Sequence, residues 1–200
     1  WLGQGRLASS ELVIVHDGTD GAVAMIPRDA QMPRAASILG DGTSWCTREG
    51  FSWFETYIAR GPLYVLLLPD GARAQLHLPT LQWCDARNTR VTVAAAAQFE
   101  ALTTSWRPAF EVTGAVDWMG LLRAAPQVGI TAGVMTSLAA LLAAGLVAHV
   151  PDEGVRFLFE YVAVDAAAVP QLLEAAALLA KKGLVIPPVL VRRCVLALAW

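Results

Sequence analysis

The sequence predicts an α+β fold, in which a small antiparallel β-meander with packed helices is followed by an Ala-rich all-α helical region. Before Val91, short apolar or β-branched runs alternate with Gly, Pro and Asp turn residues. After Val91, alanine dominates and apolar residues recur at helical spacing. We therefore expect an α+β domain over residues 1–112 and a helical, hairpin-like region over 113–200.

The elements of the meander follow one another in the first half of the chain. The apolar runs 12–15 and 21–26, with a turn signal at Asp17-Gly18, predict a β-hairpin. Two helices and three strands are expected next, each ended by Gly, Pro or Asp-containing turns. The helices are 35–39 and 51–60, and the strands are 63–68, 72–78 and 81–84.

The second half predicts helices and connecting turns. The expected helices are 118–125, 130–144, 152–162, 166–182 and 189–199. The segments 141–147 and 178–185 share an apolar helix end, a Gly cap and an apolar exit, which is typical of helical hairpins.

Composition limits the kinds of function. The net charge is −2, and the Lys and Arg residues are scattered, so we expect no nucleic-acid partner. Hydrophobic residues make up 56% of the chain and charged residues only 16%, which favours a protein partner or self-association. The three cysteines form no C-x-x-C pair or Cys/His cluster, so no disulfide framework, metal site or cofactor is expected.

Residues 127–151 contain no Asp, Glu, Lys or Arg and are long enough to cross a hydrocarbon core of roughly 30 Å. The segment is rich in Ala, Gly, Thr and Ser, however, and these residues contribute little favourable free energy when a helix inserts into a membrane. A buried helix is therefore favoured over a membrane segment. The chain begins Trp1-Leu2-Gly3 without a basic region before an apolar run, so we expect no secretion through a signal peptide.

The residues with reactive side chains are concentrated between Gly42 and Asn88. Cys46 lies close to the start of the expected helix 51–60, where the helix dipole would stabilise a thiolate. With His77 as general base and Asp85 as orienter, Cys46 could act as a catalytic nucleophile. In the alternative interpretation, Cys46 is a small buried hydrophobe and His77 a hydrogen-bonded structural residue.

One ordered set of residues spans this block. It runs Gly40-x-Gly42-Thr43-x-Trp45-Cys46-Thr47, Phe54-x-x-Tyr57, Gly61-Pro62-Leu63-Tyr64-Val65, Gln75-x-His77 and Gln82-x-x-Asp85-x-x-Asn88. This order resembles a pattern in uncharacterised proteins of bacteriophages and related mobile elements, over residues 38–92 only. The resemblance implies one site or one tightly specified core. Its expected binding residues, beside the three catalytic candidates, are Trp45, Tyr64, Gln75, Gln82 and Asn88.

Two functional hypotheses follow. In the first, the chain is a phage-encoded binding or assembly protein that acts through protein–protein contacts, in the cytoplasm of a bacterial host or on the virion. In the second, it is a thiol-dependent hydrolase or transferase that uses Cys46 and His77. Membrane association through 127–151 is a third and weaker alternative. The excess of apolar residues favours the first.

Overall fold

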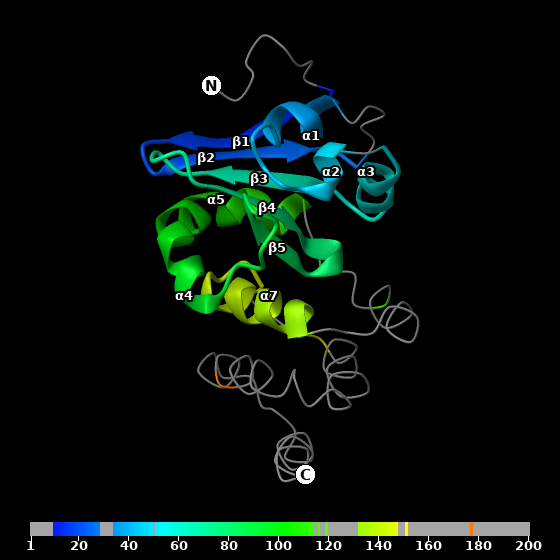
Figure 1. The fold of residues 1–200 in the computed structure, drawn as a ribbon. Coiled ribbons are helices and arrows are strands. Elements are labelled where there is room, and N and C mark those ends of the chain that lie inside the picture. Colours follow the sequence, from blue (N-terminus) through cyan, green and yellow to red (C-terminus); the bar gives the residue numbers. More distant parts are fainter. Residues whose placement is uncertain are drawn as a thin grey trace, which may run out of the picture.

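The chain folds around one five-stranded antiparallel sheet with helices on both faces (Figure 1). The structure is a computed structural model, and it describes residues 10–28, 34–49, 51–113, 116, 119, 132–147, 151 and 177. The strands are β1 (Val13–Gly18), β2 (Gly21–Ile26), β3 (Leu63–Leu67), β4 (Arg73–His77) and β5 (Gln82–Asp85). They lie side by side in chain order, so the sheet is a simple meander.

The two faces of the sheet carry different helices. One face packs against α1 (Arg34–Leu39), α2 (Cys46–Glu49) and α3 (Phe51–Ile58). The other packs against α4 (Val93–Ala96), α5 (Glu100–Thr113) and α7 (Ala132–Ala143). Short 3₁₀ turns, η1 (Leu78–Thr80) and η2 (Ala97–Phe99), complete the described elements.

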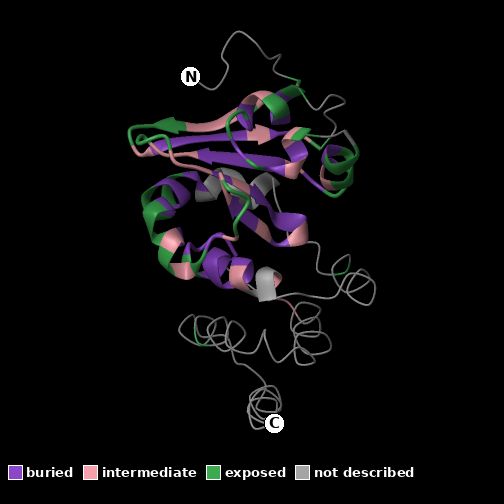
Figure 2. Cartoon of the chain, in the orientation of Figure 1, coloured by how far each residue is buried: buried purple, intermediate pink, exposed green. Residues whose placement is uncertain are grey.

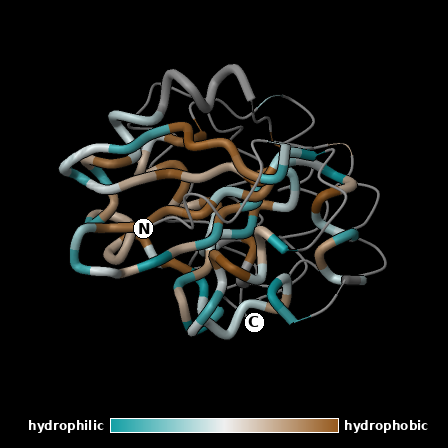
Figure 3. The backbone as a smooth tube through the Cα atoms, turned by 90° about the horizontal axis from the view of Figure 1, so that it is seen from above, coloured by the Kyte–Doolittle hydropathy of each residue, from teal (hydrophilic) through white to brown (hydrophobic). Residues whose placement is uncertain are grey.

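The period-2 alternation of the strands divides the buried side chains into two cores. Ala22, Ala24 and Ile26 of β2 enter the core under α1 and α3, which we call the α3-side core. Val23 enters the opposite core with residues of α5 and α7, which we call the α7-side core. Burial on both faces makes β2 and β3 the centre of the molecule (Figure 2). Polar residues gather in the turns that join the strands (Figure 3).

The α+β prediction is confirmed for the described residues, with changes at element ends. The β1–β2 turn lies at Thr19-Asp20 and not at Asp17-Gly18, because Gly18 and Gly21 pair across the hairpin. The helices α2, α4 and α5 were not predicted. The expected domain boundary at 112/113 falls inside α5 (Glu100–Thr113).

The helix predicted over 130–144 is α7, and residues 137–142 of it are buried. Ser137 fixes α7 to the sheet, since its hydroxyl accepts from the Trp83 amide at 3.3 Å and from the Arg90 guanidinium at 3.2 Å. Gly145, at φ +72°, ends the helix as predicted. The α7 side chains therefore share a core with the sheet.

Within the described ranges, none of the helices combines the length and apolar character that a membrane span requires. The expected helices 152–162 and 189–199 lie outside the described residues, as do the segment 178–185 and all but one residue each of 118–125 and 166–182.

Candidate functional site

The register of β4 and β5 places four polar side chains on one face of the sheet. Gln75 is paired with Cys84, and His77 with Gln82. The alternate residues Ala74, Leu76 and Trp83 fill the α7-side core, so this set of four faces α2 and α3. We call Gln75, His77, Gln82 and Cys84 the polar sheet face.

Each glutamine of the polar sheet face is held by one helix side chain. The Thr47 hydroxyl of α2 lies 2.8 Å from Nε2 and 3.0 Å from Oε1 of Gln75. The Tyr57 hydroxyl of α3 donates to Oε1 of Gln82 at 2.7 Å. These contacts join helices α2 and α3 to the two strands through one buried side chain, that of Thr47, and three partly buried ones.

His77 is the most deeply buried member of the polar sheet face, at 1% exposed. Its Nδ1 lies 2.7 Å from the Thr80 hydroxyl, and its ring meets the Tyr57 ring edge-on with centroids 5.1 Å apart. No group in the described part of the chain completes a hydrogen bond to its Nε2.

Burial lowers the pKa of His77 to about 4. Backbone groups of Gly61 and Tyr57 oppose this change, and the nearby Arg60 charge adds to it. Since the imidazole is neutral at neutral pH and a weak proton acceptor, it is poorly matched to removing a proton from a thiol.

Cys46 begins α2 beside this face and is half-buried. The loop before it is fixed over the end of β5: the buried Trp45 indole N–H donates to the Asp85 carbonyl at 2.6 Å, and the Ser44 amide to the Ala86 carbonyl at 2.8 Å. Because none of the described groups, Cys46 included, forms a hydrogen bond with His77 Nε2, Cys46 and His77 do not form the predicted hydrogen-bonded pair of nucleophile and base.

The contact that orients the His77 ring comes from Thr80 and not from Asp85. The Asp85 carboxylate accepts from the backbone amides of Arg87 and Thr89, both at 2.9 Å, and so stabilises its own turn. Asn88 lies in the same turn with φ +62°, which asparagine tolerates better than most residues.

Tyr64 lies away from the other candidates, on the opposite face of the sheet. It is buried in the α7-side core, where its ring lies 4.9 Å from that of Trp106. The structure therefore gathers Gln75, His77 and Gln82, with Trp45 and Cys46 at their margin.

Sequence reasoning did not assign site roles to Thr47, Tyr57, Thr80 or Cys84. The first three contact the polar sheet face, and the fourth belongs to it. Burial raises the pKa values of Tyr57 and Cys84, so both favour the neutral form. Two sequence signals could have indicated such roles: Tyr57 lies at helical spacing in the segment 51–60, and Thr80 follows His77 by three residues.

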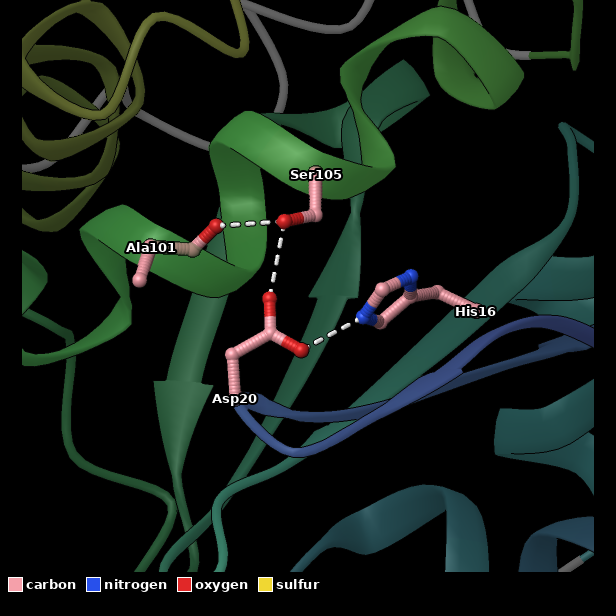
Figure 4. Close-up of polar contacts among 4 residues, drawn as sticks. All are labelled: His16, Asp20, Ala101 and Ser105. Atoms are coloured by element: carbon pink, nitrogen blue, oxygen red, sulfur yellow. Dashed lines mark hydrogen bonds and ion pairs between the residues drawn. The ribbon is translucent and has the colours of Figure 1, made fainter.

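A second polar cluster joins the β1–β2 turn to α5 (Figure 4). The Asp20 carboxylate contacts His16 Nε2 and accepts from the Ser105 hydroxyl, each at 2.8 Å. The His16 and then the Ser105 hydrogen bonds lower the pKa of Asp20. Since the carboxylate lies between the other two groups, the imidazole cannot activate the serine as in a catalytic triad. The cluster is a clamp between turn and helix.

Groups of three or more His, Cys, Asp or Glu side chains able to hold a metal ion are absent from the described residues. Comparison of the sequence with protein families and with curated proteins, and of the structure with solved structures, gives no match.

Proposed function

We propose that this chain is a phage-encoded binding or assembly protein that acts through protein–protein contacts, with further copies of itself as one partner. The supporting observation is the direction in which the side chains of the 42–88 block point. Trp45 and His77 of this block are buried, and Cys46, Gln75 and Gln82 are partly buried, whereas Trp53 is 56% exposed on the outer side of α3. The phage origin rests on the resemblance of the same block to mobile-element proteins.

Trp53 is not needed to attach α3 to the sheet. The same helix buries Phe54 at 1% exposed and Ile58 at 6% exposed in the α3-side core. An exposed tryptophan presents a large apolar surface with one hydrogen-bond donor, and such residues often anchor protein interfaces.

A thiol-dependent activity has less support. It requires a base that contacts Cys46, whereas His77 is held by Thr80, is buried below α3 and has a lowered pKa. The hydrogen bonds of the polar sheet face instead connect the two strands β4 and β5 to the two helices α2 and α3, which is a structural role.

Sedimentation velocity over a range of protein concentrations tests the proposal. We expect species larger than the 21.3 kDa monomer, and we expect Trp53→Ser to weaken their formation about tenfold or more. Glu55→Ser, at another exposed position on the same helix, is the matched control and should leave association unchanged. A chain that stays monomeric at every concentration contradicts the proposal.

A further inference from the structure

Two free cysteines lie at the polar sheet face. Cys84 is a buried member of that face, and Cys46 begins α2 beside it and is half-buried. The hydrogen bonds that join the helices to this face come from Thr47 and Tyr57 and not from either thiol. The two cysteines are therefore left for another role.

The loop that leads to Cys46 runs along the end of β5. The Ser44 amide donates to the Ala86 carbonyl at 2.8 Å. One residue later, the Trp45 indole N–H donates to the Asp85 carbonyl at 2.6 Å. The loop thus advances along β5 toward Cys84 as it approaches Cys46.

The residue after Cys46 continues this course. The Thr47 hydroxyl contacts both side-chain atoms of the Gln75 amide, and Gln75 is paired with Cys84 across the sheet. Cys46 lies between Trp45 and Thr47 in the chain. The contacts on either side of it therefore bring Cys46 to the level of Cys84.

The electrostatics of this cluster agree with that placement. Burial raises the pKa of Cys84, the Arg90 charge lowers it, and negative charges on Asp85 and then Cys46 raise it. Burial also raises the pKa of Tyr57, and negative charges on both cysteines add to that rise. Because a charge changes the pKa of another group mainly at short range, the two thiols and the Tyr57 hydroxyl are neighbours.

We propose that Cys46 and Cys84 are a redox-sensitive pair, which closes to an intramolecular disulfide when a hydroperoxide oxidises Cys46. The bond would clamp the loop before α2 to β5, where the Ser44 and Trp45 hydrogen bonds hold it in the reduced protein. This inference goes beyond the proposed function, because assembly through the outer side of α3 requires neither thiol.

The exposure of the two thiols gives the order of the reaction. The half-buried Cys46 meets the oxidant first: its sulfur attacks one peroxide oxygen, the O–O bond breaks, and the other oxygen takes the thiol proton and leaves as water or an alcohol. Cys84 then attacks the sulfur of the Cys46 sulfenic acid, and the sulfenic oxygen leaves with the Cys84 proton as water. Two thiols and one hydroperoxide thus give one disulfide.

Peptide mapping after oxidation tests the pairing. Cys194→Ser removes the third cysteine, which lies outside the described residues, and gives the reference chain. After treatment of this folded chain with a small excess of hydrogen peroxide, we expect the intact mass to fall by two hydrogen atoms. A peptide with Cys46 should be joined to one with Cys84, and dithiothreitol should separate them. Thiols that stay reduced, sulfinic acid at Cys46 without the link, or a link only between two chains would overturn the proposal.

An exchange of two residues in the loop supplies a control of identical composition. Ser44→Cys combined with Cys46→Ser, in the reference chain, moves the thiol to an exposed position two residues away. Because a disulfide forms only between closely opposed residues, the link to Cys84 should form about tenfold more slowly or less in this variant. Equal rates would overturn the placement of Cys46 beside Cys84. Circular dichroism checks that the fold is retained.

Thermal unfolding tests the clamp itself. A disulfide that closes a long loop restricts the unfolded chain, so the oxidised reference chain should unfold about 5 °C or more above the reduced one. Dithiothreitol should remove the difference. A midpoint that oxidation leaves unchanged or lowers would show that the bond does not clamp the loop to the sheet.

Discussion

The burial of His77 predicts that acid destabilises this fold by a defined amount. In an unfolded chain a histidine has a pKa near 6.5, whereas in the folded chain the pKa of His77 is about 4. Between these values the unfolded state binds a proton that the folded state does not. Stability is therefore fully present above about pH 6.5 and is lost as the pH falls toward 4.

The size of the effect follows from the gap between the two pKa values. That gap corresponds to about 3.4 kcal/mol in full, and to about 2 kcal/mol at pH 5. The ring is 1% exposed, so solvent screening reduces this little. The physical change is the transfer of a proton to an imidazole that lies against the Tyr57 ring and beside the Arg60 charge.

The assay is urea unfolding of the unchanged chain and of His77→Asn at about pH 7 and about pH 5, followed by circular dichroism. The asparagine amide keeps a polar group near Thr80 but cannot titrate in this range. We expect the variant to be less stable at neutral pH, and to lose about 2 kcal/mol less than the unchanged chain on acidification. The low pKa of Asp20 affects both proteins equally. An identical pH dependence in the two would refute the reasoning.

Two further predictions concern the Trp45 indole before α2 and the backbone at Gly21. Trp45→Phe removes the indole N–H that donates to the Asp85 carbonyl. It should lower the free energy of unfolding, measured in urea, by about 1–3 kcal/mol. A loss below about 0.5 kcal/mol would contradict a structural role for this contact. Gly21 has φ +133°, and a Cβ added there would lie only 2.4 Å from the Leu67 carbonyl oxygen. Gly71, at φ +86°, has open space around it and is the control. Gly21→Ala should therefore lower the thermal midpoint of unfolding much more than Gly71→Ala does, and equal effects would show that the backbone at Leu67 moves away freely.

Local patterns were enough to predict most of the meander. Apolar alternation and turn residues predicted the ends of β2 to β5 to within one or two residues. In these strands the sequence pattern of apolar residues matches the side chains that are buried. The β1–β2 turn lies two residues after the Asp-Gly signal, because Gly18 is still paired with Gly21. Glycine is needed at position 18 for another reason, since a Cβ there would lie 2.5 Å from the Asp20 carboxylate.

Helix α5 was missed for a different reason. Its sequence holds several Thr and Ser residues and Pro108, all unfavourable inside a helix. The burial of Leu102 at 0% exposed and Trp106 at 1% exposed outweighs that local preference. This is a tertiary effect that no short window contains.

The site was predictable only where strand alternation decides it. Alternation places Gln75 and His77 on one face, and the cross-strand register adds Gln82. The partner of His77 depended on whether its ring turned toward η1 or toward the end of β5. The ring orientation decides whether Thr80 or Asp85 is the hydrogen-bond partner of His77, and it follows from the packing of His77 under α3.

The central claim is that the chain works through association and that the polar sheet face, with Trp45 and Cys46 at its margin, is a structural junction. Sedimentation velocity of the unchanged chain beside Trp53→Ser and Cys46→Ala tests this most directly. The account predicts concentration-dependent assembly that Trp53→Ser weakens and Cys46→Ala leaves intact. A monomer at all concentrations, or assembly that depends on the Cys46 thiol and not on Trp53, would contradict it.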